Sequence, residues 1–359
     1  MRNISKLILL FLTVVTSSSI SSAQKTRYQR VIGGDKDDNN YSIDKTLDGG
    51  FILTGYTTSF GAGGEDAYLI KTNALGAVEW TKSYGNTGNE IGWSVKATQD
   101  SGFIVAGTTN SSGRAKGFVF KTNKSGTILW STELNSDSIA DIYNVLISKF
   151  GGIYAVGYAS TDSNGSDMFV AKLNSSGAVQ WGRRYGSPGD EEAYSIAEDD
   201  RGFLAVVGVT NYDSTTEGAR NSQYGDQDIA VAIIDSFGNL KVMKNYGSVD
   251  LETAWDIKPY GRDQYAIIGW TRNFPFGSND AFVMFIDTVG NYKTVYGYGT
   301  GGDDRIFDVE VNIDGGLILS GYLQQNGGDR DVMVLNINSN GNLINYSILG
   351  GFDEDGHWP

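Results

Sequence analysis

The sequence predicts an all-β fold, a β-propeller built from four-stranded antiparallel blades. Three observations predict it: a high content of glycine and aromatic residues, six copies of a unit of about fifty residues, and four short strand-like runs in each copy. The chain has 359 residues, of which 48 are glycine and only 4 are proline. Each glycine in a helix interior costs about 1 kcal/mol, so this composition favours short strands and tight turns over helices.

Two series of glycines define the repeat. One series lies in strand-like runs, at Gly55, Gly107, Gly157, Gly208, Gly269 and Gly321, and the other lies in turns, at Gly76, Gly126, Gly177, Gly238, Gly290 and Gly341. Steps in both series are 50 to 52 residues, apart from one step of 61 residues that falls in the same copy in both. That copy carries an insertion around Asn211 to Gln227, whose Ser, Thr, Asn and Gly content is typical of an extended loop.

The second copy illustrates the four strands of each unit. Residues 93–97 alternate between apolar and polar side chains, residues 103–107 form an apolar run, and residues 118–121 and 128–130 follow after polar turns. An Asn or Asp stands three residues before each turn glycine, where its side chain can accept hydrogen bonds from the turn backbone. These residues are Asn73, Asn123, Asn174, Asp235, Asp287 and Asn338.

The copies span about residues 35–85, 86–135, 136–187, 188–247, 248–299 and 300–350, within one domain of residues 24–359. Apolar runs without alternation, such as residues 51–53, favour a propeller over a sandwich, because propeller blades bury both faces of their middle strands. Residues 27–34 look like a fourth strand and residues 351–359 like the start of another copy. We therefore expect a seven-blade ring whose last blade takes its outer strand from the N-terminus, which would need roughly 40 residues beyond this sequence, judged by the repeat length. A six-blade ring is the alternative.

The N-terminus predicts an exported protein. Residues 1–23 have the charged start, apolar run and small-residue cleavage site of a signal peptide, and the run is too short to span a bilayer. The expected location is secreted, extracellular or at the cell surface, with the periplasm as the alternative.

Removing this segment changes the formal net charge from −14 to −16, since it carries Arg2 and Lys6 and no acidic residue. This charge argues against nucleic acid and anionic membrane surfaces as partners, and we expect no membrane insertion of the mature chain. Cysteine is absent, which excludes disulfides, thiolate metal sites and cysteine nucleophiles.

Residues 279–283 (NDAFV), Gly290 and residues 301–304 (GGDD) resemble the repeats of bacterial seven-bladed β-propellers. Residues 48–56 and 69–73 are similar to related repeats of large secreted surface proteins of Gram-negative bacteria. This resemblance covers about residues 27–350 and implies a propeller outside the cell, without implying an activity.

A weaker resemblance concerns three tryptophans, Trp80, Trp130 and Trp181, each four residues after a turn glycine. They are similar to the G-x-x-x-W motif of quinoprotein dehydrogenase propellers, in which the tryptophan packs between blades. The other three copies have Val242, Thr294 and Asn345. We interpret these tryptophans as packing anchors rather than cofactor contacts.

Acidic residues gather where one copy joins the next, at Asp35, Asp37, Asp38, Glu90, Asp190, Glu191, Glu192, Asp303, Asp304, Asp353, Glu354 and Asp355. They lack the spacing of a calcium-binding loop, so we interpret them as turn caps, with Ca²⁺ as the alternative.

The single histidine, His357, matches a strand position that is aromatic in every copy. We therefore assign no catalytic, cofactor-binding or metal-binding residue.

These observations predict a non-catalytic binding or scaffold module for protein or polysaccharide. Loop aromatics suited to sugar contact are Tyr212, Tyr224, Phe274 and Phe276. The alternative is an extracellular enzyme, either polysaccharide-cleaving or quinone-dependent. Unique polar residues that break the repeat near the channel mouth, above all in the fourth copy, would favour the enzyme.

Overall fold

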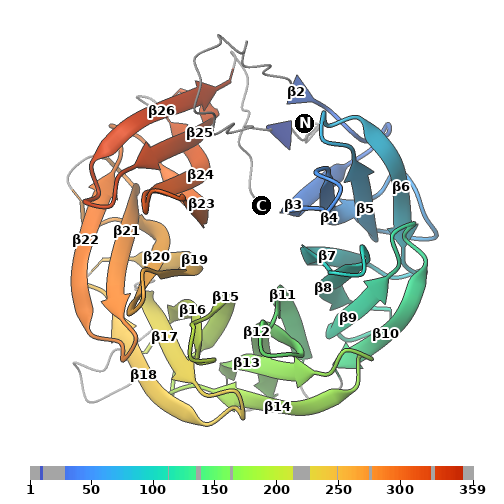
Figure 1. Ribbon diagram of the computed structural model, residues 1–359, viewed down its shortest axis with the longest axis horizontal. Helices are drawn as coiled ribbons and strands as arrows, with labels where there is room; N and C mark the ends of the chain where they lie inside the picture. Colours follow the sequence, from blue (N-terminus) through green and yellow to red (C-terminus); the bar gives the residue numbers. More distant parts are fainter. Residues whose placement is uncertain are drawn as a thin grey trace. The chain divides into compact units, whose positions relative to one another are not determined.

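The fold is a β-propeller of six blades in the part of the chain that the structure describes (Figure 1). The structure is a computed structural model, and it describes residues 9–10, 29–111, 113–134, 139–161, 165–212, 227–248, 250–274, 277–324 and 328–350. Every regular element in these ranges is a β-strand, and six sheets have four strands each. The predicted all-β class and four-stranded blades are confirmed.

Each blade uses four consecutive strands, placed side by side in chain order. Blade 1 has β3 (Asp38–Lys45), β4 (Phe51–Thr57), β5 (Asp66–Thr72) and β6 (Val78–Tyr84). Blade 2 has β7 (Glu90–Ala97), β8 (Phe103–Thr109), β9 (Lys116–Thr122) and β10 (Ile128–Leu134). Blade 3 has β11 (Ile139–Ile147), β12 (Ile153–Thr161), β13 (Gly165–Leu173) and β14 (Val179–Tyr185). Blade 4 has β15 (Glu191–Glu198), β16 (Leu204–Thr210), β17 (Asp228–Ile234) and β18 (Leu240–Tyr246). Blade 5 has β19 (Glu252–Tyr260), β20 (Gln264–Thr271), β21 (Asp280–Asp287) and β22 (Tyr292–Tyr298). Blade 6 has β23 (Arg305–Val311), β24 (Leu317–Gln324), β25 (Arg330–Ile337) and β26 (Leu343–Leu349).

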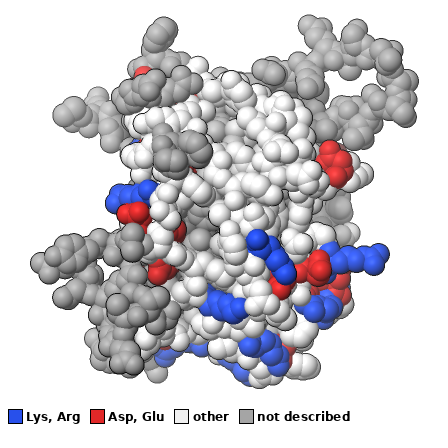
Figure 2. Space-filling view, turned by 90° about the vertical axis from the view of Figure 1, so that its left-hand side faces the viewer, with Lys and Arg blue, Asp and Glu red and all other residues white. Residues whose placement is uncertain are grey.

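The chain divides into two compact units, residues 1–114 with 120–129 and residues 115–119 with 130–359. The first unit holds blade 1 and the first two strands of blade 2, and the second unit holds blades 3 to 6 entire. Within the second unit, β11, β15, β19 and β23 lie on the inner side, and β14, β18, β22 and β26 lie on the outer rim (Figure 1). The side that carries β22 and β26 has interspersed acidic and basic side chains and broad uncharged areas (Figure 2).

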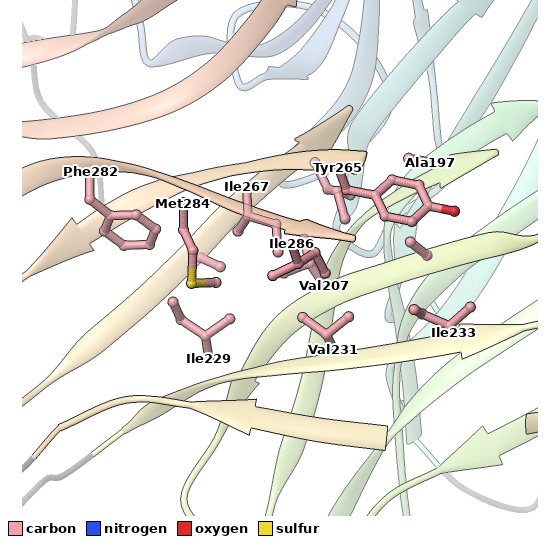
Figure 3. Close-up of a cluster of buried hydrophobic side chains, with 13 residues drawn as sticks. Ala197, Val207, Ile229, Val231, Ile233, Tyr265, Ile267, Phe282, Met284 and Ile286 are labelled. Atoms are coloured by element: carbon pink, nitrogen blue, oxygen red, sulfur yellow. The ribbon is translucent and has the colours of Figure 1, made fainter. Parts of the chain in front are cut away.

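The core lies between facing blades. Between blades 4 and 5, Ile229, Val231 and Ile233 of β17 face Ile267 of β20 and Met284 of β21 (Figure 3). All residues of β16 and β17 are buried, which explains their apolar runs without alternation. Full burial of one such side chain stabilises the fold by roughly 1.5–3 kcal/mol, so these interfaces supply most of the stability.

Blade 6 is buried on one face only. Leu319, Met333 and Leu335 pack against the core shared with blade 5, whereas Val332 and Val334, on the opposite face of β25, are partly exposed. The middle strands of blade 5 show no such alternation.

Outer strands dock onto the turn glycines of the following blade. A Cβ on Gly177 would lie 2.4 Å from Cε3 of Trp130, and one on Gly238 would lie 3.2 Å from Trp181. In four blades, a tyrosine four residues after the tryptophan position donates its hydroxyl to the carbonyl of the turn glycine in the next blade, at 2.6 to 2.7 Å. The pairs are Tyr84–Gly126, Tyr185–Gly238, Tyr246–Gly290 and Tyr298–Gly341. The tryptophans thus pack between blades, as interpreted from the sequence.

The expected seventh blade is not shown by the structure. Residues 351–359 lie outside the described ranges, and of residues 27–34 the pair Gln29–Arg30 forms β2. β2 pairs antiparallel with β1 (Leu9–Leu10), which belongs to the predicted signal segment. Within the described ranges there is also no helix long and apolar enough to cross a bilayer.

Candidate functional site

A β-bulge recurs in the first strand of every blade, and its extra residue is always aromatic. The strand register shifts around Tyr41, Trp93, Tyr143, Tyr194, Trp255 and Phe307. A bulge leaves one residue out of the strand pairing and redirects its side chain. The first glycine series lies opposite these bulges, and a Cβ on Gly157 would lie 1.7 Å from the Asp141 carbonyl oxygen. Glycine is therefore needed wherever the bulge brings the two backbones together.

The bulge residues of the second unit form a continuous aromatic row along the inner strands. Ring centroids are 5.5 Å apart for Tyr143 and Tyr194, 4.7 Å for Tyr194 and Trp255, and 5.5 Å for Trp255 and Phe307. All four side chains are partly exposed. In the first unit Tyr41 and Trp93 form the equivalent pair, at 4.4 Å. The fold thus places a partly exposed aromatic surface on its inner strands.

The blades differ at the positions beside this row. Two residues before each aromatic, the blades have Asn39, Ile91, Asp141, Glu192, Thr253 and Arg305. Their cross-strand partners are Tyr56, Thr108, Tyr158, Val209, Trp270 and Tyr322. Because the surrounding framework repeats, residues that do not repeat are the best candidates for function.

Blades 3 and 4 contribute two carboxylates next to the row. The Tyr158 hydroxyl donates to Oδ2 of Asp141 at 2.6 Å, and the Tyr194 hydroxyl donates to Oε2 of Glu192 at 2.9 Å. Burial raises the pKa of Glu192, and the nearby charge of Asp141 raises it further. Burial also raises the pKa values of Tyr143, Tyr158 and Tyr194, so these phenols stay protonated and act as hydrogen-bond donors.

Blades 5 and 6 contribute a basic cluster at the other end of the row. The Arg305 guanidinium lies 4.3 Å from the Trp270 ring centroid, and that of Arg330 lies 4.8 Å from the Tyr322 centroid. Nε of Arg305 and Nη2 of Arg330 donate to Asp303, at 2.9 and 3.0 Å. The site therefore runs from carboxylates at blades 3 and 4 to guanidinium groups at blade 6.

The acidic residues that begin the first strands act as turn caps. Glu90, Glu191 and Glu252 accept hydrogen bonds from the backbone N–H groups of Asn86, Ser187 and Ser248, at 2.8, 2.8 and 3.0 Å. Threonines at the ends of the second strands donate to the same carboxylates. This confirms the capping interpretation for Glu90 and Glu191, and Glu252 makes the same contacts in blade 5. Among the described residues there is no group of three or more His, Cys, Asp or Glu that could hold a metal ion.

The predicted loop aromatics are placed differently from the row. Phe274 packs against the core between blades 4 and 5, close to Gly297, and Tyr212 follows β16 with its backbone carbonyl accepting from Asn245. Several residues named in the sequence analysis lie outside the described ranges. They are Tyr224, Phe276, His357, residues 353–355 and most of the 211–227 insertion. Sequence reasoning missed Asp141 and Arg305, and it interpreted Glu192 as a turn cap, whereas Glu192 accepts a hydrogen bond from Tyr194 beside the row. The signal that could have identified all three residues is that they break the repeat.

Comparison with solved structures shows the fold alone. An ulvan lyase of a polysaccharide lyase family, bound to -[GlcA(1-4)Rha3S]-, is similar with a TM-score of 0.54 and 12% identity, over 86% of this chain and 82% of that one. The Chaetomium thermophilum protein Sqt1, bound to the N-terminus of ribosomal protein L10, is similar with a TM-score of 0.51 and 11% identity, over 89% of this chain and 76% of that one. No known family profile and no curated protein sequence matches the chain.

Proposed function

We propose that this protein is a polysaccharide-binding module that acts outside the cell or at its surface. The single observation that carries the proposal is the aromatic row Tyr143, Tyr194, Trp255 and Phe307 on the inner strands of blades 3 to 6. Aromatic rings with a few placed polar groups are the usual lining of ligand sites, because they remove apolar ligand surface from water at little entropy cost.

The geometry of the row suits a long ligand. Tyr194 and Trp255 stack on each other at 14°, whereas Tyr143 meets Tyr194 at 59° and Phe307 meets Trp255 at 70°. The two outer rings therefore do not fully cover the stacked pair. The carboxylates of Asp141 and Glu192 can accept hydrogen bonds from sugar hydroxyls. Similar propellers are compatible with either expected ligand class, since the ulvan lyase is bound to a saccharide and Sqt1 to a protein segment. The aromatic row favours the saccharide.

The test is ligand binding by the wild-type chain and by Trp255→Ala. A glycan array identifies a ligand, and calorimetry then measures its affinity. We expect Trp255→Ala to weaken binding about tenfold or more, as is typical when a central aromatic contact is lost. The control is Tyr292→Ala, which removes an exposed aromatic from the outer strand β22. An empty glycan array together with an empty pull-down from envelope extracts would contradict a binding function.

A second candidate function, a polysaccharide-cleaving enzyme, is favoured by the pair Asp141 and Glu192. These two carboxylates do not repeat in the other blades, and the raised pKa of Glu192 suits a proton donor. Cleavage of a polysaccharide panel that is abolished by Glu192→Gln, with the fold unchanged, would favour the enzyme over the binding module.

Two structural expectations belong to this proposal. Export depends on residues 1–23, so a chain that lacks them should stay inside the producing cell.

The seven-blade ring, and with it membership of the secreted bacterial repeat family, is supported by the partly exposed face of blade 6. If a longer chain adds a seventh blade, the partly exposed side chains of Val332 and Val334 should become protected from chemical labelling.

A further inference from the structure

We propose that Arg305 and Arg330 bind an oxyanion of the ligand, which makes the ligand an acidic polysaccharide that carries uronate carboxylates or sulfate esters. This inference rests on the proposed polysaccharide-binding function and specifies its ligand.

Asp303 cannot satisfy both arginines. Its two carboxylate oxygens accept from Arg305 Nε at 2.9 Å, Arg330 Nη2 at 3.0 Å, the Tyr322 hydroxyl at 2.9 Å and Asn279 Nδ2 at 2.7 Å. A carboxylate offers about four lone-pair positions, so its acceptor capacity is used up. Burial alone would raise the pKa of Asp303, but the hydrogen bonds from Arg305, Asn279 and Tyr322 lower it, and the group stays charged.

The cluster therefore carries surplus positive charge. In the part of the chain that the structure describes, Asp303 is the only carboxylate that forms a salt bridge with Arg305 or Arg330. Each guanidinium has five N–H donors and uses one of them here. Nε of Arg330 is buried and makes no hydrogen bond with any described residue. The remaining N–H donors of the two guanidinium groups have no acceptor among the described residues, and an incoming anion could accept from those that are exposed.

Trp270 and Tyr322 contact the guanidinium groups and restrain their positions. Trp270 lies 4.3 Å from the Arg305 guanidinium, and Tyr322 lies 4.8 Å from that of Arg330. A cation–π contact of this kind restrains a guanidinium, and the N–H groups that do not face the ring remain available for a planar or tetrahedral oxyanion. The two arginine side chains keep 27% and 24% of their surface exposed, so solvent and ligand can reach them.

Their position connects them to the aromatic row. Arg305 stands two residues before Phe307, the last ring of the row, at the position that Asp141 and Glu192 occupy in blades 3 and 4. A chain lying along the row would place an anionic substituent near blade 6 and away from the two carboxylates. The charge difference between the two ends would then also fix the direction in which the chain binds.

The experiment compares matched ligands on the full chain. The probes are hexagalacturonate and its methyl ester, and a sulfated galactan oligosaccharide and its desulfated form. Binding is measured by calorimetry and by the indole N–H resonance of Trp270. The variants are Arg330→Gln and Arg330→Lys. The control is Arg262→Gln, which removes the same charge from the exposed turn at the other end of the blade 5 strands.

We expect the charged member of one pair to bind at least about tenfold tighter than its neutral form, in a salt-dependent way. Arg330→Gln should weaken that binding about tenfold, Arg330→Lys should restore part of it, and Arg262→Gln should leave it unchanged. The pair that responds identifies carboxylate or sulfate as the group bound.

Two results would overturn the inference. If charged and neutral forms bind equally and Arg330→Gln has no effect, while Trp255→Ala weakens binding, the anion subsite is wrong and the polysaccharide function stands. If no saccharide on a wider array binds, the polysaccharide function and the anion subsite are both wrong, with one exception. The exception is a sulfate titration that shifts the Trp270 resonance to saturation in the wild type and leaves it unchanged in Arg330→Gln. That last outcome would support the anion subsite and contradict the polysaccharide function.

Discussion

The contact between a turn glycine and the preceding blade offers a direct test of how the blades are held together. We consider Gly177→Ala, with Gly315→Ala as its matched control. Both glycines end a four-residue turn that begins with Asn, and their φ angles are +84° and +80°. A Cβ on Gly177 would lie 2.4 Å from Trp130, whereas a Cβ on Gly315 would have no atom within 4 Å.

The left-handed backbone penalises alanine by about 1–2 kcal/mol at either position. At Gly177 the clash with Trp130 adds about 1–3 kcal/mol, the usual effect of overpacking. We therefore expect Gly177→Ala to lower the free energy of unfolding by about 2–5 kcal/mol and Gly315→Ala by about 1–2 kcal/mol.

The assay is urea unfolding of each variant, followed by circular dichroism. A double-mutant cycle with Trp130→Ala should show coupling of about 1 kcal/mol or more at Gly177 and none at Gly315, because only the first pair is in contact. Equal destabilisation by the two alanines, or no coupling to Trp130, would refute the role given to this contact.

Three further predictions concern hydrogen bonds of buried or partly buried side chains. Tyr246→Phe removes the bond to the Gly290 carbonyl and should lower the free energy of unfolding by about 1 kcal/mol, whereas Tyr292→Phe, at an exposed site, should leave it unchanged in the same urea assay. Burial raises the pKa of Tyr185 to about 12, so its contribution to stability should be constant below about pH 10 and be lost as the pH rises to about 12. Unfolding measured across this range should be less pH-dependent in Tyr185→Phe, and an unchanged slope would contradict the assignment. Glu191→Gln turns an acceptor of loop N–H and hydroxyl groups into a partial donor at a fully buried site, and should lower the thermal midpoint by several degrees.

The turns were the part of the fold that sequence could predict in detail. Asn123 accepts from the N–H groups two and four residues later, and Gly126 has a φ of +75°, as the fixed spacing requires. Such features are local, because a turn depends on a few adjacent residues. The six complete copies could also be counted from the sequence, and each of them forms one blade. The seventh blade, which the sequence at the two ends suggests, is not shown by the described residues.

The candidate site could not be predicted because its residues come from separate blades. Asp141 and Glu192 are 51 positions apart, and nothing in their local sequence indicates that they share one surface. Gly157 and the other glycines of its series mark the repeat, but their spacing does not reveal the bulge that requires them. The bulge aligns the copies residue by residue and shows that Asp141, Glu192 and Arg305 occupy one position that differs from blade to blade.

The repeat itself explains why this site can vary without loss of the fold. The glycine opposite the bulge has no room for a side chain, and the capping carboxylate of Glu191 is fully buried, so replacing either costs stability. The side chains two residues before each aromatic are only partly covered at Asp141, Glu192 and Arg305, and they contribute little to the cores between blades. Selection can therefore change the ligand at these positions while the framework keeps their placement constant. It follows that Asp141→Asn should alter ligand binding with little change in the unfolding midpoint, whereas Gly157→Ala should destabilise the fold, and the reverse pattern would mean that the framework and the site have been assigned the wrong way round.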